Sequence, residues 1–544
     1  MEGHATGAAA QDGGGGAPWR DLALVTLLLL VAIGLRAWHL THTEVAARDS
    51  IGYIRYAWQF GHHSWVKTIA DPRQEQHPGY PLAILAVSYP VRQFVAGPDT
   101  LVMQLSAQLA SCLASVLLVV PTFFLGRELF NRGVSFWAAL IFQCLPAAGR
   151  VFADGLSEGV FLLFAATALF GALHALRIHS PRWFALTGVS GGLAYLTRPE
   201  GALIVAATGL VLLVVQCVRS RRVPWRRLLA CGVALGVAAA AVGGPLVALT
   251  GKLTVKATPI RIINNAMAPG LEAPTLDTLR RGDVADSPPF AVWFIDDGDH
   301  TSAWALQAVG KEFAKGCYYV LWAPMALGLW WFRDRFRLFP GAWVLFLVSL
   351  VILALMWRVA SLLGYVSDRH LLLPILCGLP WAVAAVPKLV TGLAAFLCRV
   401  GYLARLGARL PAAAGPLWAT LFLAAFVVAT LPRTLESLHA NRSGFRDAGV
   451  WIAQHGHPWD EVIDPYSWSH YYAGRVFLED ESPAPPRGET KVCYVVLEAS
   501  GREHSRLPLI QRAMRRAAAG HKVKEWTRQR AKETIDVIVF EAPP

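Results

Sequence analysis

One aspartate stands where a carboxylate could act as a base. Asp49 follows an apolar run, Asp21 to Trp38, whose roughly eighteen residues are enough to cross a bilayer. Arg48 and Arg55 flank it and favour its ionised form by charge, so it could take the proton of an acceptor hydroxyl. An aspartate that merely caps an interfacial helix beginning at Ser50 is an equally good interpretation.

Two further acids lie between apolar runs. Asp154 and Glu158 are four residues apart, so on one helix they would share a face. Such a pair could bind a divalent cation or hold an arginine. It could also serve only as an acidic helix start that suits the helix dipole.

The turn Thr197–Gly201 interrupts two apolar segments and carries Arg198 and Glu200. Pro199 ends the incoming helix and begins the outgoing one. An arginine at this boundary suits a phosphate, which accepts two parallel hydrogen bonds from a guanidinium. An ion pair of Arg198 with Asp154 or Glu158 is the alternative.

Arg369 and His370 open another apolar run and also suit an anionic headgroup. Simple snorkelling to the membrane interface would explain them as well. His62, His63 and His77 lack a third ligand at helical spacing, so they are weak evidence for a metal site, and the metal stays unknown.

These residues are positioned by membrane helices. Of 544 residues, 55% are hydrophobic and the mean hydropathy is +0.42, which indicates an α-helical polytopic membrane protein. The net charge of +13 belongs to loops and does not indicate nucleic acid as a partner. About eleven spans are predicted from hydropathy: 21–40, 103–125, 134–152, 157–176, 183–197, 201–218, 228–249, 314–332, 339–357, 370–386 and 413–432. Pro81 to Val95 is interpreted as a half-buried or interfacial helix, with a further span as the alternative.

Basic loops predict the orientation. Five Arg-rich loops fall on one side of these spans, and the positive-inside rule makes that side cytoplasmic. Residues 1–18 are then a disordered cytoplasmic tail, and residues 19–432 form a transmembrane module with outer loops 41–80 and 251–313. Residues 433–544 are expected to be a small extracytoplasmic α/β domain. It would hold a helix from Ser443 to about Gln454, buried strands at Val492–Leu497 and Ile535–Phe540, and a basic helical stretch between the strands. We therefore expect a multi-pass protein of the cell (inner) membrane.

Together these segments resemble membrane-embedded glycosyltransferases with the GT-C fold that use polyprenyl-phosphate sugars. The likeness is to the protein O-mannosyltransferase and aminoarabinose-transferase superfamily (glycosyltransferase family 39-like), and it covers about residues 20 to 390. The segments that carry it are Arg48-Asp49 with Tyr53 and Tyr56, His77-Pro78-Gly79-Tyr80-Pro81, Asp154-Gly155-Leu156-Ser157-Glu158, Gly192 to Gly201, and Arg369-His370-Leu371-Leu372-Leu373-Pro374.

The resemblance implies roles for these residues. Asp49 corresponds to the family's proposed base. Many members have a second acid beside it; here Ser50 follows, so that role would pass to Asp154 or Glu158, with Glu200 as a supporting acid. Donor phosphate would meet the residues Arg198, Arg369 and His370. Donor and acceptor would meet the first outer loop, with Arg48, Tyr53, Arg55, His77 and Tyr80.

The implied reaction moves a sugar from a polyprenyl-phosphate donor to a hydroxyl of a lipid, glycan or protein, with inversion. No cofactor is certain, and a divalent cation is possible. A transporter or flippase of a lipid-linked sugar would use the same cavity without a base, but the repeated halves typical of such proteins are not evident. A structural or sensory protein would leave these charges unexplained.

Overall fold

The computed structural model describes residues 18–71, 74–218, 224–255, 301–399, 415–478, 483–498, 508–530 and 533–543. The predicted tail 1–18, apart from Pro18, and most of the predicted loop 251–313 therefore lie outside the described residues.

Long apolar helices dominate the chain. In the described part of the chain, seven helices are long and apolar enough to cross a bilayer, or eight if one bent pair of helices is counted as a span. They are α1 (Pro18–Thr41), α5 running into α6 (Asp99–Leu117, Val119–Leu129), α9 (Glu158–Ile178), α12 (Trp225–Thr250), α19 (Gly341–Leu363), η2 running into α20 (Asp368–Leu371, Leu372–Arg399) and α22 (Gly415–Thr434). The prediction of a helical polytopic membrane protein is confirmed.

The predicted number of about eleven spans is too high by this measure. The bent pair is α7 (Arg132–Cys144) and α8 (Pro146–Ala153), which meet at 59° because the residue before a proline avoids helical geometry. The predicted spans 183–197, 201–218 and 314–332 hold shorter helices: α10 (Pro181–Thr197), α11 (Gly201–Val218), whose apolar part is Gly201–Val214, and α17 (Trp322–Trp331).

One predicted span, 314–332, is interrupted. Tyr318 and Tyr319 both have positive φ, at 51° and 59°, a conformation that cannot continue a right-handed helix. They separate α16 (Ser302–Gly316) from α17, and α18 (Asp334–Leu338) follows.

Three shorter helices gather at one end of the module: α2 (Arg48–His62), α3 (Trp65–Ala70) and α4 (Gly79–Phe94). The α2 and α4 helices meet through Tyr53 and Tyr80, whose rings contact edge to face at 5.1 Å. The end of α4 from Ala86 to Phe94 is mostly exposed, whereas the start of the helix is mostly buried, as expected for the predicted half-buried helix at Pro81 to Val95.

The C-terminal domain is built on a four-stranded mixed sheet in the order β1-β2-β4-β3. β1 (Glu461–Ile463) runs parallel to β2 (Cys493–Glu498); β2 and β3 (His521–Arg530) are antiparallel to β4 (Glu533–Ala542). The helical elements are η4 (Ala440–Arg442), α23 (Ser443–His455), α24 (Trp468–Tyr472), η5 (Arg475–Phe477) and α25 (Pro508–Ala518).

This domain agrees with the predicted helix at Ser443 and with both predicted strands. The prediction of one basic helical stretch between the strands was wrong in part, because its second half forms the edge strand β3.

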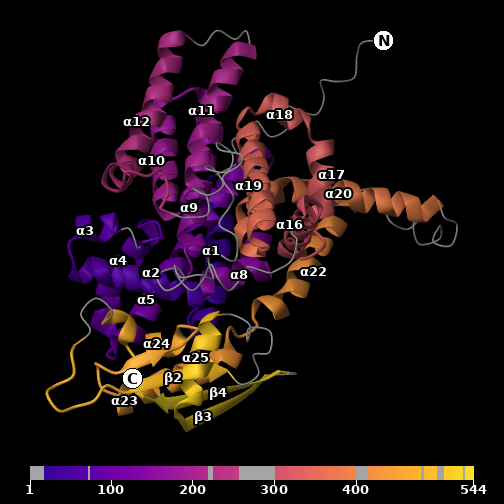
Figure 1. Cartoon of the computed structure of the whole chain (residues 1–544). Coiled ribbons are helices and arrows are strands. Elements are labelled where there is room, and N and C mark those ends of the chain that lie inside the picture. Colours follow the sequence, from indigo (N-terminus) through magenta and orange to yellow (C-terminus); the bar gives the residue numbers. More distant parts are fainter. Residues whose placement is uncertain are drawn as a thin grey trace, which may run out of the picture.

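The C-terminal domain covers the end of the module that carries α2 and α4 (Figure 1). One apolar core joins the two, with Ile51 and Tyr80 from the module and Phe445, Tyr471 and Val537 from the domain. The helix α18 lies at the opposite end of the module. Asp49, the first acid of α2, therefore lies where the two parts meet.

Candidate active site

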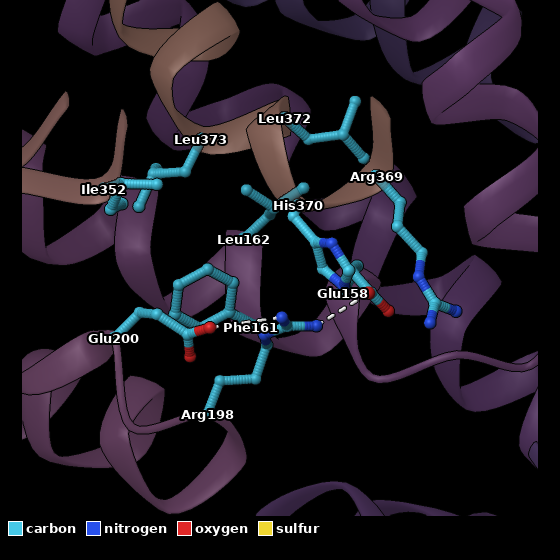
Figure 2. A pocket seen from close by; sticks show the side chains of 10 residues that line it. All are labelled: Glu158, Phe161, Leu162, Arg198, Glu200, Ile352, Arg369, His370, Leu372 and Leu373. Carbon is cyan, nitrogen blue, oxygen red and sulfur yellow. Dashed lines mark hydrogen bonds and ion pairs between the residues drawn. The ribbon is translucent and has the colours of Figure 1, made fainter. Parts of the chain in front are cut away.

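A small pocket lies between segments that are distant in sequence (Figure 2). The helix α9, the α10–α11 turn, α19, η2 and α20 each contribute side chains. Its lining is polar on one side and apolar on the other: Glu158, Arg198, Glu200, Arg369 and His370 against Phe161, Leu162, Ile352, Leu372 and Leu373. Five residues predicted from the sequence therefore come together in this pocket: Glu158, Arg198, Glu200, Arg369 and His370.

Arg198 is held between two carboxylates. Its Nη1 donates to Glu158 Oε1 at 2.6 Å and its Nη2 donates to Glu200 Oε1 at 3.2 Å. The Arg198 and Glu158 side chains are buried, so this pair is little screened by solvent. Burial lowers the pKa of Arg198, but the charges of Glu200 and Glu158 outweigh it and raise the pKa. The ion pair expected as an alternative for Arg198 is thus present.

The turn that presents Arg198 depends on glycines. A Cβ on Gly201 would lie 2.2 Å from the Tyr195 nitrogen, so this reversal is too tight for a side chain. A Cβ on Gly79, at the start of α4, would lie 2.7 Å from the Leu196 carbonyl oxygen. The His-Pro-Gly loop is therefore packed directly on the turn before Arg198.

Asp49 reaches the pocket through Arg369. Arg369 Nη2 lies 2.5 Å from Asp49 Oδ2, and both side chains are partly exposed, at 22% and 29%. The preceding residue, Asp368, is anchored by Arg150 Nη2 at 2.9 Å, and its N–H donates to Glu312 Oε2 at 3.1 Å. Arg369 is therefore offered from a fixed segment, and its charge is balanced by the candidate base.

His370 follows Arg369 and lines the same pocket. In the view of Figure 2, Glu158 and His370 lie between the guanidinium groups of Arg198 and Arg369. The ring of Tyr365 contacts His370 edge to face at 6.3 Å. The predicted phosphate-binding residues therefore form one group.

Three predicted residues of the first loop have structural contacts. Tyr53 shares a hydrogen bond of 3.1 Å with Ser157, at the start of α9, and burial raises its pKa to about 12. The Tyr80 hydroxyl donates to the Ala107 carbonyl at 2.8 Å. His77 is buried, and its Nδ1 lies 2.8 Å from the backbone carbonyl oxygen of Tyr195. These residues attach α2, α4 and the loop before α4 to the start of α9, to α5 and to α10.

Arg48 and Arg55 are both half-buried on α2 and are not among the pocket's lining residues. Arg48 turns toward the C-terminal domain, where its Nη2 donates to the Pro465 carbonyl at 3.3 Å. Burial lowers the pKa of Arg48 to about 10, against the opposing charges of Asp49 and Asp464.

Asp154 and Glu158 do not share one helix face, contrary to the expectation. The helix α8 ends before Asp154, and Gly155, at φ +67°, turns the chain before α9 begins at Glu158. Asp154 Oδ1 instead lies 2.9 Å from His439 Nε2. Within the described part of the chain, no group of three or more His, Cys, Asp or Glu side chains could hold a metal ion. The pair does not fit the cation site considered from the sequence, and no step is assigned to a metal.

The prediction missed the apolar wall of the pocket and the anchors of Arg369. Nothing in an apolar run marks Ile352 or Leu372 as lining a site. Asp368 did carry a signal, since it begins the charged triplet Asp368-Arg369-His370 that opens a span.

Comparison with known proteins supports the fold and finds a family model that matches part of the chain. Residues 100–242 match the family model described as dolichyl-phosphate-mannose-protein mannosyltransferase. A search of curated proteins found no match.

Among solved structures, the chain resembles ArnT from Cupriavidus metallidurans bound to undecaprenyl phosphate, with a TM-score of 0.50 and 15% identity over 96% of this chain and 98% of that one. It also resembles AglB, the archaeal oligosaccharyltransferase of Archaeoglobus fulgidus, solved with an inhibitory peptide and a dolichol-phosphate, with a TM-score of 0.50 and 15% identity. That match covers 87% of this chain but 62% of AglB, so the chain spans about three fifths of the oligosaccharyltransferase. The resemblance inferred from the sequence, to membrane glycosyltransferases that use polyprenyl-phosphate sugars, is confirmed.

Proposed function

We propose that this chain transfers a sugar from a polyprenyl-phosphate donor to an acceptor hydroxyl, with Asp49 as the general base. The observation that carries the proposal is the meeting of Asp49 with Arg369 at a pocket that also contains Arg198 and His370. A base beside an arginine that can bind phosphate suits a transfer from a lipid phosphate.

The donor phosphate would bind at Arg369 and His370, with Arg198 behind them. Arginine suits this role because its planar fork matches two phosphate oxygens. Glu158 and Glu200 hold the Arg198 guanidinium in place, and the apolar side of the pocket suits the lipid end of the donor. The relatives solved with undecaprenyl phosphate and dolichol-phosphate support this class of donor.

The Asp49–Arg369 ion pair gives the donor a second role. A phosphate that binds Arg369 competes with Asp49 for the same guanidinium. Once Asp49 Oδ2 is displaced from Arg369, an incoming hydroxyl can donate to that oxygen. Donor binding would thus release the base, which favours donor before acceptor.

The transfer takes place in a single displacement at the anomeric carbon of the sugar. Asp49 takes the proton of the acceptor hydroxyl as its oxygen bonds to the anomeric carbon. The bond from that carbon to the phosphate oxygen breaks, and polyprenyl phosphate leaves with its negative charge stabilised by Arg369. A single displacement inverts the anomeric centre.

We place this reaction at the extracytoplasmic face of the cell membrane, with a cytoplasmic N-terminus and an extracytoplasmic C-terminal domain. The basic loops support this orientation. Arg127 and Arg132 both pair with Asp21 at the start of α1, and the Arg-rich α18 lies at the end opposite the C-terminal domain (Figure 1). A lipid-carried donor suits a face without cytosolic nucleotide sugars, and its acceptor would be a lipid, glycan or protein hydroxyl.

The test uses purified protein, a polyprenyl-phosphate sugar and a panel of acceptor hydroxyls. Acceptor-dependent release of free polyprenyl phosphate is the expected result. A flippase would instead move the intact donor across sealed vesicles without cleaving it, and that outcome would overturn the proposal.

A further inference from the structure

The linker between α1 and α2, residues 42–47, delivers Asp49 to the site and is held by the C-terminal domain. Val45, Ala46 and Ala47 are all buried, so their backbone groups must be paired within the protein. The Ala46 N–H donates to the Tyr472 hydroxyl at 3.1 Å, and the Trp468 indole N–H donates to the Ala46 carbonyl at 2.8 Å. Both polar groups of this residue are therefore satisfied by the one helix α24.

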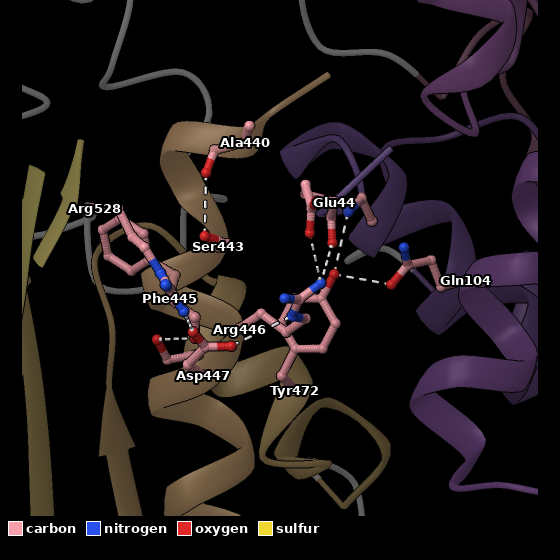
Figure 3. Close-up of polar contacts among 11 residues, drawn as sticks. Glu44, Gln104, Ala440, Ser443, Phe445, Arg446, Asp447, Tyr472 and Arg528 are labelled. Atoms are coloured by element: carbon pink, nitrogen blue, oxygen red, sulfur yellow. Dashed lines mark hydrogen bonds and ion pairs between the residues drawn. The ribbon is translucent and has the colours of Figure 1, made fainter. Parts of the chain in front are cut away.

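The Tyr472 hydroxyl connects three segments. It accepts from Ala46 and donates to Gln104 Oε1 on α5 at 2.8 Å, so it lies between the linker and a spanning helix (Figure 3). Arg446 Nη1 adds a contact to the Glu44 carbonyl at 2.9 Å and to its carboxylate at 3.1 Å. The linker is thus fixed on both sides of Val45.

The first turn of α2 is held by the contact of Arg48 with the Pro465 carbonyl, by the pairing of Asp49 with Arg369, and by the linker that precedes it. Its N-cap residue, Ala47, has no side chain that can cap the helix. The Ala47 carbonyl accepts from Ser50 Oγ at 2.6 Å, a contact within the same turn. The Ala46 contacts therefore help to set where the first turn, with Asp49, lies relative to Arg369.

We propose that Trp468 and Tyr472 are positioning residues for the transfer, acting on Asp49 through the Ala46 backbone. The C-terminal domain is then a part of the catalytic machinery as well as a cover. This inference rests on the proposed function. Small displacements of a base from its acceptor cost rate more than donor affinity, because the donor is held by other groups.

The neighbouring residue Tyr471 supplies a matched control. It is on the same helix, and its hydroxyl also crosses to the module, where it donates to the Thr100 carbonyl at 2.5 Å. That contact docks the domain on α5 and does not involve the linker. Tyr471→Phe and Tyr472→Phe therefore delete the same atom at the same interface.

The experiment compares Trp468→Phe, Tyr472→Phe and Tyr471→Phe in the full-length protein, measuring kcat and donor KM for release of polyprenyl phosphate. We expect Trp468→Phe and Tyr472→Phe to lower kcat by at least about tenfold, with donor KM within about twofold of wild type. Tyr471→Phe should keep the wild-type kcat even if its melting temperature falls as much as that of Tyr472→Phe. Equal kcat in Tyr472→Phe and Tyr471→Phe would overturn the inference.

A second measurement does not depend on turnover. Amide hydrogen exchange of residues 43–50 should be faster in Tyr472→Phe than in Tyr471→Phe, and equal exchange would count against the inference. If the proposed function is wrong, wild type releases no polyprenyl phosphate, and both proposals are overturned. Wild-type turnover that Asp49→Asn abolishes, with no effect of Trp468→Phe or Tyr472→Phe, would overturn this inference alone.

Discussion

Arg369 Nη2 lies 2.5 Å from Asp49 Oδ2, so the candidate base of this site is paired with the arginine proposed to bind the donor phosphate. The two residues come from helices at opposite ends of the membrane module's sequence, α2 and η2. We propose that this contact couples two events, because a phosphate that takes Arg369 Nη2 displaces Asp49 Oδ2 from it.

Replacing Asp49 by Asn should separate chemistry from binding. An amide cannot take the acceptor proton, so transfer should fall by roughly 100-fold or more. The variant also removes the carboxylate that competes for Arg369, so the affinity for polyprenyl phosphate should stay equal or rise. Release assays and binding of a fluorescent lipid phosphate measure the two effects. Asp99→Asn, which alters an exposed pair with Arg92, is the control; wild-type turnover in Asp49→Asn would exclude the base role.

Arg369→Gln should weaken donor binding. A hydrogen bond to a charged group contributes about 1.5 to 3 kcal/mol, which corresponds to roughly a 10- to 150-fold rise in Kd. The donor affinity of Arg369→Lys should lie between those of wild type and Arg369→Gln, since lysine keeps the charge but cannot donate two parallel hydrogen bonds. Titration with a polyprenyl phosphate measures both. Arg433→Gln, at an exposed pair with Glu436, should bind as wild type does; equal affinities of the two Gln variants would remove Arg369 from the phosphate site.

Glu158→Gln should lower stability. Glu158 and Arg198 are buried together, and removing one charge leaves the other with Glu200 alone. We expect a loss of about 2 to 3 kcal/mol in the free energy of unfolding, seen as a lower melting temperature. The matched change Glu436→Gln breaks a pair whose side chains are 69% and 46% exposed, where a loss under about 0.5 kcal/mol is expected. Equal melting temperatures for the two variants would contradict this account of the Arg198 turn.

Gly79→Ala should disturb the contact between α4 and the turn before Arg198. The new Cβ would lie 2.7 Å from backbone atoms of Leu196, which cannot move aside as a flexible side chain could. Overpacking of this kind costs about 1 to 3 kcal/mol. Gly236→Ala on α12, where nothing lies within 4 Å, should be neutral or slightly stabilising. Thermal unfolding of the two variants measures the difference in stability, and identical unfolding curves would show that the contact between Gly79 and Leu196 is not tight.

Much of the fold followed from apolar runs, and the exceptions have local causes. The span expected at 314–332 is broken by the positive φ of Tyr318 and Tyr319, which hydropathy does not register. The edge strand β3 has charged side chains along most of its length, as edge strands do, and such a run is easily taken for a basic helix.

The site was partly predictable for a similar reason. Charged residues at the ends of apolar runs are costly unless paired or functional, and this led to Glu158, Arg198 and Arg369. Which charge pairs with which depends on how the helices pack, so the Asp49–Arg369 pair could not be derived. The contacts of Trp468 and Tyr472 with Ala46 could not be predicted, since they join the C-terminal domain to a linker whose sequence has no recognisable pattern.

The most direct test of the account is a cryo-EM structure of the protein with a polyprenyl phosphate bound. We predict the phosphate within hydrogen-bonding distance of Arg369 and His370, with the Asp49 carboxylate released from Arg369 and facing the space for the acceptor. A phosphate bound elsewhere, with the Asp49–Arg369 ion pair intact, would contradict it.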